Sequence, residues 1–435
     1  SVMAVLIRHC CPARGSATIR YIQLYGGFTM KTPPFLVFAV SCLLITGVVA
    51  ADERRDGGMK KVQTGIDVLV RDELRALAGQ RVGLITNQTG IDGLGVSTIV
   101  RLYDAPGVDL VALFSPEHGL HGKLDIASIS DSKDDGTGLR VFSLYGDTRQ
   151  PTAEMLDGID TLVFDIQDIG TRFYTYISTL GLAMQAASEH GKRFVVLDRP
   201  NPINGVDVSG PFADAGRESF TAFHKLPVRH GMTTAELALM FRSERNLDLE
   251  LEVIELEHWN RAGYFDGTGL RWVNPSPNMR SLAQALLYPG IGLLETTNLS
   301  VGRGTDTPFE VIGAPWLNGD SFAFELNALG LAGVVFIPIR FEPDSSKFAG
   351  EACGGVNIAV TNREVFDPIR TGLEIARQLR LNYPGEWDIE SYDRLLVHAA
   401  TFEALREGRS VSEIEAGYRE GLEAFKDRRA RYLLY

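Results

Sequence analysis

Acidic and amide side chains follow several short apolar segments in the first half of the chain. Glu117 and His118 follow one segment in Ser-Pro-Glu-His-Gly, and Asp165 ends another. A carboxyl group can donate or accept a proton, while amides, arginines and tyrosines hold hydroxyl-rich ligands by hydrogen bonds. The residues that carry this chemistry are Asn87, Glu117, His118, Asp165, Gln167, Asp168, Arg172, Tyr174, Tyr176, Asp198, Arg199 and Asn201. Their types favour a crevice that binds a sugar.

Glycoside hydrolysis is the reaction that several carboxylates in such a crevice favour. It requires one carboxyl group that gives a proton to the leaving oxygen, and a second group that attacks, activates water or steadies a substrate acetamide. Glu117 is the candidate acid, because it follows a buried strand in a turn tight enough to need Pro116 and Gly119. Asp165 and Asp168 are candidates for the second group. The sequence leaves open which of them acts, and whether the anomeric configuration is retained or inverted.

A parallel α/β sheet would bring these residues together. Segments with the near-continuous hydrophobicity of strands buried on both faces occur at residues 81–86, 110–115, 139–144, 161–165 and 193–198. Helices are expected between them, and the clearest runs from about 172 to 189 before Gly191 stops it. Because ligands bind beyond the carboxyl ends of parallel strands, the polar residues share one edge. We therefore predict a Rossmann-like catalytic domain over residues 62–215.

A second, less regular domain is expected over residues 216–435. The capping box Thr233-Thr234-Ala235-Glu236 opens a helix at 233–243. Further elements are a loop-rich stretch at 272–316, a strand at 334–339 and helices near 367–381 and 412–428. The predicted fold class is α/β, with a C-terminal α+β domain that completes the cleft.

The common nucleotide-binding and serine-hydrolase motifs are missing. The glycines at positions 90, 93 and 95 lack the dinucleotide-binding spacing, and neither a phosphate loop nor a Gly-x-Ser-x-Gly elbow follows a strand. We therefore expect no cofactor.

A zinc site is the alternative that the histidines offer. His118 and His121 form His-x-x-His, with Glu117 and Asp125 nearby, as a metal-dependent amidase or deacetylase would need. The spacing is not the i, i+4 pair of a helical zinc site, and two neighbouring glycines favour a turning loop. We therefore expect no bound metal.

The charge balance and the N-terminus indicate the compartment and the partners. The formal net charge is −12 and the basic residues are not clustered, so neither nucleic acid nor an anionic membrane is an expected partner. Met30-Lys31 precedes an apolar run over 35–51, which predicts a signal peptide at 30–51 after an upstream extension at 1–29. We expect an exported, periplasmic protein with no stable membrane association after signal removal. Its oligomeric state stays open.

Several sequence blocks resemble the exo-acting β-N-acetylmuramidases of glycoside hydrolase family 171. The blocks are Ser115–Gly119, Phe164–Tyr176, Leu197–Pro202, Arg229–Thr233, Ser276–Met279, Thr297–Ser300 and Gly302–Thr305. The resemblance implies removal of N-acetylmuramic acid from the non-reducing end of peptidoglycan fragments, in a cleft between two domains, with Glu117 as the catalytic residue. Val301 and Arg280 depart from the residues common in relatives, Glu and Pro, and the effect of these departures stays open.

The implied substrate carries a lactyl carboxylate, which an acidic protein can bind only through locally positive groups. Arg303, Arg172 and Arg199 are the candidates, and an ion pair with a nearby aspartate is the alternative role for each. His230, Asn278 and Asn298 complete the expected binding set, although His230 could instead hydrogen-bond the following helix start. The expected partners are muramyl saccharides derived from peptidoglycan. A non-catalytic cell-wall sugar-binding protein is the alternative function.

Overall fold

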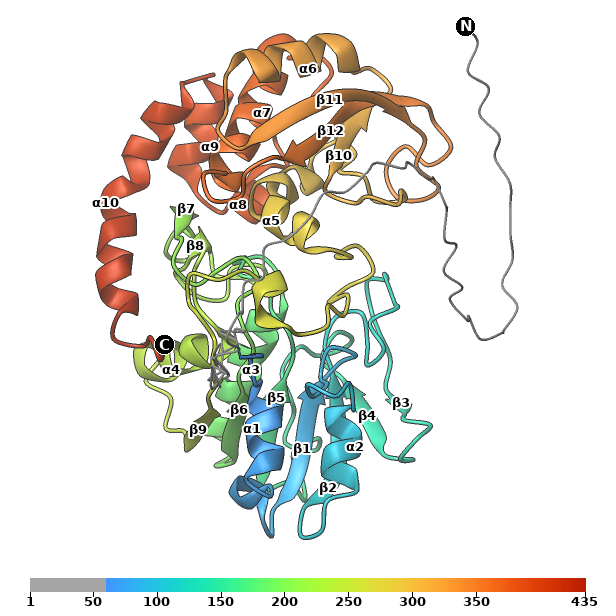
Figure 1. Cartoon of the computed structure of the whole chain (residues 1–435), viewed down its shortest axis with the longest axis vertical. Helices are drawn as coiled ribbons and strands as arrows, with labels where there is room; N and C mark the ends of the chain where they lie inside the picture. Colours follow the sequence, from blue (N-terminus) through green and yellow to red (C-terminus); the bar gives the residue numbers. More distant parts are fainter. Residues whose placement is uncertain (1–59) are drawn as a thin grey trace, which may run out of the picture. The chain divides into compact units, whose positions relative to one another are not determined.

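A seven-stranded sheet organises the first half of the described chain, residues 60–435 of a computed structural model (Figure 1). Its strands lie in the order β3 (Ser132–Lys133), β4 (Arg140–Ser143), β2 (Asp109–Ser115), β1 (Arg81–Thr86), β5 (Thr161–Asp165), β6 (Arg193–Leu197) and β9 (Leu251–Ile254). Neighbouring strands are parallel except β3 and β4. The direction of winding reverses between β1 and β5, as in a Rossmann-like sheet. The predicted fold class is confirmed, whereas the predicted extension and signal peptide lie outside the described residues.

Helices cover both faces of this sheet because alternate strand residues point to opposite sides. Val82 and Leu84 of β1 pack with α1 (Gly65–Arg71) and α2 (Thr98–Tyr103). Ile85 packs on the other side, in the core that contains α3 (Tyr176–Glu189) and α4 (Thr234–Glu244). The predicted capping box of α4 is present, with Thr233 as its N-cap. This three-layer arrangement leaves the carboxyl ends of the strands for loops.

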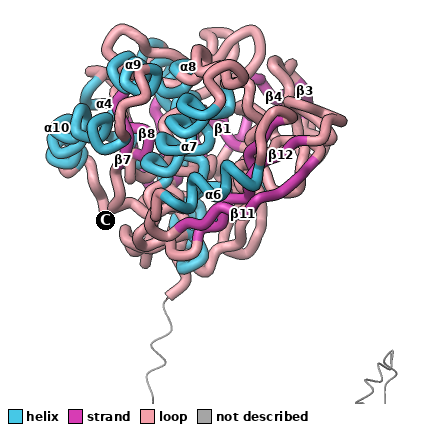
Figure 2. The backbone as a smooth tube through the Cα atoms, turned by 90° about the horizontal axis from the view of Figure 1, so that it is seen from above, coloured by secondary structure: helices cyan, strands magenta, loops and turns pink. Residues whose placement is uncertain are grey.

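The C-terminal half is built on a small antiparallel sheet. Its strands lie in the order β10 (Val311–Ala314), β12 (Cys353–Val360) and β11 (Val334–Phe341), and α6 (Gly319–Ala328) packs along β11 and β12 (Figure 2). The remaining helices are α5 (Leu282–Ile291), α7 (Pro368–Asn382), α8 (Asp393–Leu396), α9 (Ala399–Arg406) and α10 (Val411–Arg429). The shorter elements are β7 (Ser209–Phe212), β8 (Pro227–Arg229) and three 3₁₀ turns, η1 (Arg75–Leu77), η2 (Phe265–Thr268) and η3 (Gly292–Thr296).

The structure differs from the sequence-based expectation at several elements, and strand β10 is one of those not predicted. Helix α5 lies inside the stretch predicted as loops. The sequence did not indicate a helix there, because Pro289 and Gly290 ordinarily interrupt helices. Gly290 is required there, since a Cβ atom would lie 1.8 Å from the Pro368 carbonyl oxygen of α7. Helix α3 begins at Tyr176 rather than near Arg172. The parallel sheet also continues to β9, beyond the boundary expected at residue 215.

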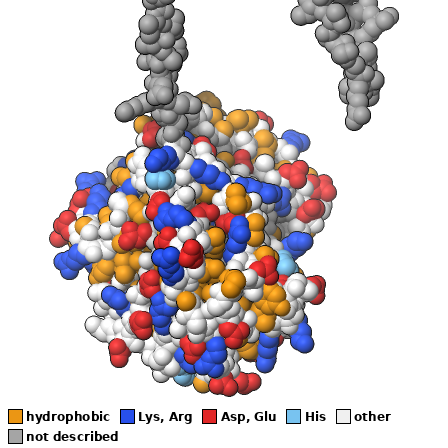
Figure 3. Space-filling view, turned by 60° about the horizontal axis from the view of Figure 1, so that its bottom comes forward, with side chains coloured by type: hydrophobic (Ala, Val, Ile, Leu, Met, Phe, Trp, Pro, Cys, Tyr) orange, Lys and Arg blue, Asp and Glu red, His pale blue; other side chains and the backbone are white. Residues whose placement is uncertain are grey.

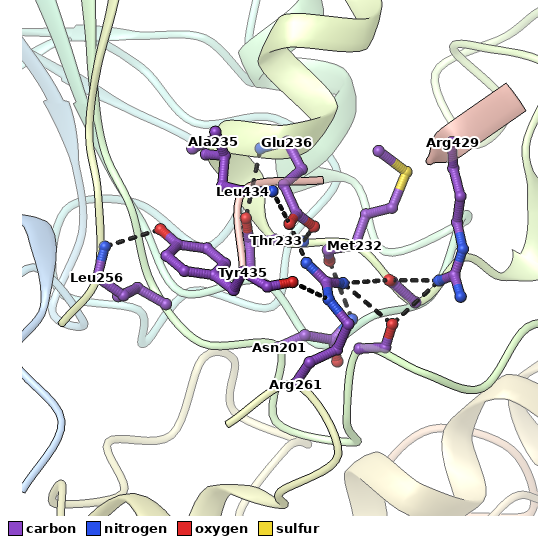
Figure 4. Close-up of polar contacts among 12 residues, drawn as sticks. Asn201, Met232, Thr233, Ala235, Glu236, Leu256, Arg261, Arg429, Leu434 and Tyr435 are labelled. Carbon is purple, nitrogen blue, oxygen red and sulfur yellow. Dashed lines mark hydrogen bonds and ion pairs between the residues drawn. The ribbon is translucent and has the colours of Figure 1, made fainter. Parts of the chain in front are cut away.

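Polar contacts join the end of the chain to the first half. Helix α10 runs from the C-terminal half back towards α4 (Figure 1), and Figure 4 shows the segment after it beside the start of α4. The Tyr435 hydroxyl donates to Asp198 Oδ2 at 2.8 Å, and the Leu256 N–H donates to the Tyr435 hydroxyl at 2.7 Å. Glu236 accepts from the Arg261 guanidinium and from the Leu434 N–H. The two halves are thereby linked around α4.

Charges of both signs are intermixed on the face shown in Figure 3, where Lys and Arg alternate with Asp and Glu. Among residues 60–435, no helix combines the length and hydrophobicity needed to cross a bilayer. The expectation that nucleic acid is not a partner rests on the charge balance and stays a prediction.

Asp198 should make stability depend on pH. Burial raises the pKa of Asp198 to about 7, although the Ala235 N–H and other donors oppose this. Because the folded-state pKa is above the unfolded one, its contribution is complete below about pH 4 and is lost as pH rises to about 7. Urea unfolding at several pH values should show wild type losing about 1 kcal/mol per pH unit relative to Asp198→Asn in this window. Parallel profiles for the two proteins would contradict the expectation.

Candidate active site

A cleft of about 320 Å³ lies where loops at the carboxyl edge of the parallel sheet meet the C-terminal half. Its aromatic wall consists of Phe173, Tyr174, Tyr176, Tyr288 and Phe309, in which the Tyr288 and Phe309 ring centroids are 4.7 Å apart. The other lining residues are Glu117, His118, Thr175, Thr221, Ser276, Asn278, Met279, Glu295, Thr296, Arg303 and Leu395. Aromatic faces beside polar groups suit a sugar ring, which has apolar CH faces and polar hydroxyls.

Glu117 enters this cleft from the end of β2. The chain turns sharply there, since His118 has a φ of 68° and Gly119 a φ of 75°. The Thr175 hydroxyl donates to Glu117 Oε2. Burial, followed by a hydrogen bond and charge interaction with Glu117, raises the pKa of Tyr145 to about 12, so this phenol stays protonated. Two hydroxyl groups therefore orient a half-buried carboxyl group towards the cleft.

Arg303 and Glu295 face the same cleft from the C-terminal half. Arg303 Nη2 lies 2.7 Å from Glu295 Oε1. Burial raises the pKa of Glu295, although Arg303 and Lys347 oppose the shift. Burial would lower the pKa of Arg303, but Glu295 and Asp125 outweigh that effect and raise it. The guanidinium is therefore a permanent positive charge beside the aromatic wall.

These groups can carry out acid-assisted cleavage of a sugar bond. Glu117 can protonate a leaving oxygen, and Arg303 can bind an anionic substituent of the same ligand. Glu295 is the second carboxyl group that lines the cleft.

Comparison with known proteins places the chain in a family. Two family models match it: the N-terminal domain of exo-β-N-acetylmuramidase NamZ over residues 82–283 and the C-terminal domain over residues 286–435. Peptidoglycan β-N-acetylmuramidase NamZ of Bacillus subtilis (strain 168) is 42% identical over 397 residues, which cover 90% of this chain and 96% of that protein. The chain belongs to the NamZ family.

Two crystal structures resemble this NamZ family member closely. Both are DUF1343 family proteins from Bacteroides fragilis NCTC 9343, and each match covers 86% of this chain and 99% of the other. One has a TM-score of 0.80 at 38% sequence identity, and the other a TM-score of 0.71 at 28% identity. Both halves of the fold are thus shared with these relatives.

The structure places six of the sequence-predicted residues on the cleft of this NamZ family member. They are Glu117, His118, Tyr174, Tyr176, Asn278 and Arg303. Asp168 and His230 are buried, with His230 Nε2 3.4 Å from Asp168 Oδ2, and neither lines the cleft. His230 Nδ1 accepts from the Met232 N–H, which is the helix-start role considered as its alternative. Asn87 Oδ1 accepts from the Thr89 N–H inside the loop after β1.

Asp165 and Arg199 form an ion pair away from Glu117. Asp165 is fully buried, and its carboxylate accepts from Arg199 Nε, Arg199 Nη2 and the Thr98 hydroxyl. The alternative role for Arg199, an ion pair with an aspartate, is therefore the one observed. Arg199 and Gln167 line a separate cavity of about 130 Å³ with Trp272. Buried carboxylates need such partners, so Asp165 is held by the fold.

Four further predicted residues hydrogen-bond to other groups of the protein and do not line the cleft: Arg172, Asp198, Asn201 and Asn298. Arg172 donates to four main-chain carbonyls, those of Pro211, Leu226, Leu395 and Leu396. Burial lowers the pKa of Arg172 to about 9. Asn201 Nδ2 donates to the Met232 carbonyl, and Asn298 Nδ2 to the Glu386 carbonyl. The structure therefore does not bring Arg172 to a substrate anion, because the side chain is fully buried and both of its Nη atoms donate to main-chain carbonyls.

Sequence reasoning missed Thr175, Tyr288 and Glu295 as cleft residues. Thr175 stands between the two tyrosines that were recognised. Glu295 lies in η3, directly after α5, whose proline and glycine hid the helix from the periodicity analysis. The sequence did offer one indication of Glu295: it lies two residues before Thr297–Ser300, one of the blocks that resemble the muramidase family.

The histidines considered for zinc do not converge with a third ligand. Within residues 60–435, no group of three or more His, Cys, Asp and Glu side chains stands close enough to hold a metal ion. His118 Nδ1 instead lies 2.7 Å from the Leu124 carbonyl oxygen.

Thr175 should act as a positioning residue for Glu117. Thr175→Val removes the hydroxyl that donates to the carboxylate, and the loss of such a charged hydrogen bond should lower kcat roughly 10- to 100-fold with a smaller change in KM. Thr175→Ser keeps the donor and should restore most of the rate. Steady-state kinetics on a β-muramide would measure both. Equal activity of the valine and serine variants would remove Thr175 from this role.

Proposed function

We propose that this chain is an exported exo-β-N-acetylmuramidase, which hydrolyses the β-1,4 bond of a non-reducing terminal N-acetylmuramic acid in peptidoglycan fragments during cell-wall turnover and recycling. The observation that carries the proposal is Glu117, held by Thr175 in a cleft that also contains Arg303. The family membership supports the same reaction. The apolar segment at 35–51 supports export.

The cleft supports attack on a chain end. Its volume of about 320 Å³ lies at the low end of the range for ligand cavities, which is roughly 300–1,000 Å³. A cavity of this size suits one sugar residue better than several. The bond to be cleaved then lies next to the only sugar that enters fully, which is the terminal one.

The chemistry assigns a role to each charged group. Glu117 gives its proton to the leaving oxygen as the bond from that oxygen to the anomeric carbon breaks. Arg303 pairs with the lactyl carboxylate, which distinguishes muramic acid from glucosamine. Glu295, or the substrate acetamide, is the second group. Asp165 and Asp168, the candidates from sequence, are buried and do not line the cleft.

The product identifies the reaction. The fragment 52–435 should release free N-acetylmuramic acid from the non-reducing end of short glycans without added metal, with product measured by chromatography. Addition of a chelator should not change the rate. Cleavage within long glycans without release of the monosaccharide would contradict exo action. Binding of glycans without any release would favour the alternative, a non-catalytic sugar-binding protein.

Glu117→Gln tests the acid. The amide cannot supply the proton, so turnover of the natural disaccharide should fall roughly 10²- to 10⁴-fold. An aryl muramide should lose far less, because a phenolate leaves readily without protonation. Glu154→Gln, at an exposed position of the same half, is the matched control and should behave as wild type. A folded Glu117→Gln protein that cleaves the disaccharide at the wild-type rate would remove Glu117 from the mechanism.

A further inference from the structure

Arg303 lies between two carboxylates that hold it unequally. Glu295 Oε1 is 2.7 Å from Arg303 Nη2, and the Glu295 side chain is only 19% exposed. Both oxygens of Asp125 lie 3.4 Å from Arg303 Nη1, and the Asp125 side chain is 46% exposed. Charge-assisted hydrogen bonds are ordinarily about 2.7–2.9 Å long. Glu295 therefore anchors the guanidinium, whereas Asp125 makes a long and solvent-exposed contact.

The two carboxylates also differ in how the fold fixes them. Glu295 belongs to η3, and its main-chain carbonyl accepts from the Lys347 ammonium group. Asp125 lies in the loop that follows the Glu117 turn, and its other side-chain contact is a 3.0 Å hydrogen bond from Asn278 Nδ2. Movement of Asp125 would expose one carboxylate to water and leave the Glu295 pair intact.

Asp125 occupies a donor edge of Arg303 that an anionic ligand would need. Glu295 lies on Nη2 of the guanidinium, and Lys347 is the other cation that acts on Glu295. A further carboxylate would compete with Asp125 for Nη1. Withdrawal of Asp125 removes one negative group and frees Nη1 of Arg303.

We propose that Asp125 occupies the edge of Arg303 that receives the substrate carboxylate, so that Asp125 is a specificity-determining residue that an anionic sugar displaces. A ligand carboxylate that displaces Asp125 accepts from Arg303 Nη1 in its place, so the ion pair that is broken is replaced by a new one. A neutral sugar makes no ion pair with Arg303 and leaves the Asp125 contact in place, so Asp125 sets the difference in affinity between ligands with and without the acid. This inference rests on the proposed muramidase function.

Asp125→Asn tests the inference with two ligands that differ only in charge. Calorimetry on the full chain would compare N-acetylmuramic acid with its lactyl methyl ester. The variant keeps an oxygen that can accept from Asn278 but removes the competing charge. It should bind the acid roughly 2- to 5-fold more tightly than wild type, as expected for loss of an exposed ion pair, and bind the ester equally well. The gain should shrink as salt is added.

Asp135→Asn is the matched control, because it removes the same charge at an exposed position in the connection between β3 and β4. It should leave the affinity for both ligands at the wild-type value. Arg303→Ala should weaken the acid and largely spare the ester. An Asp125→Asn protein that binds the acid no better than wild type, or that changes for both ligands alike, overturns the inference. If wild type hydrolyses no β-muramide, the proposed function fails first and the inference falls with it.

Discussion

Desolvation of charged side chains at the carboxyl edge of the parallel sheet is the constraint on which the rest of this structure depends. Asp165, Asp198 and Arg172 have no exposed surface, and Arg199 has 5%. An unpaired buried charge would cost several kcal/mol, so each must receive partners from the fold. Arg199 pairs with Asp165, Asp198 accepts from the start of α4 and from Tyr435, and Arg172 binds main-chain carbonyls.

These partnerships position the active site by linking the two halves. Two of the carbonyls that accept from Arg172 belong to Leu395 and Leu396 in α8, and Arg172 itself precedes Thr175 by three residues. The turn that aims Thr175 at Glu117 is therefore tied to the C-terminal half, which supplies Glu295 and Arg303. The cleft requires both halves, since the acid and the cation that would act on one ligand come from opposite sides.

Local charge, rather than net charge, would allow an acidic protein of this kind to bind the proposed anionic substrate. The chain has a formal net charge of −12, yet Arg303 is held by Glu295 with part of its guanidinium directed to the cleft. Close charges in a partly desolvated site interact far more strongly than distant surface charges, which salt screens. The proposed discrimination between charged and neutral sugars therefore depends on a few side chains around one guanidinium.

The sequence by itself determined the central strands β1, β2, β4, β5 and β6, the α4 capping box and the position of Glu117 after β2, because these depend on local hydrophobic periodicity and on turn residues. The same reasoning selected Arg303, in a glycine-rich loop, as a binding residue, and it lines the cleft. It did not separate Asp165 and Arg172 from cleft residues, since both are polar side chains near strand ends. Only the tertiary structure decided that these two are buried and used by the fold, because their partners, Arg199 and the α8 carbonyls, are distant in the chain. It also decided that Glu295 faces the cleft, since the α5 helix that delivers it packs through a glycine contact with α7 that no local pattern encodes.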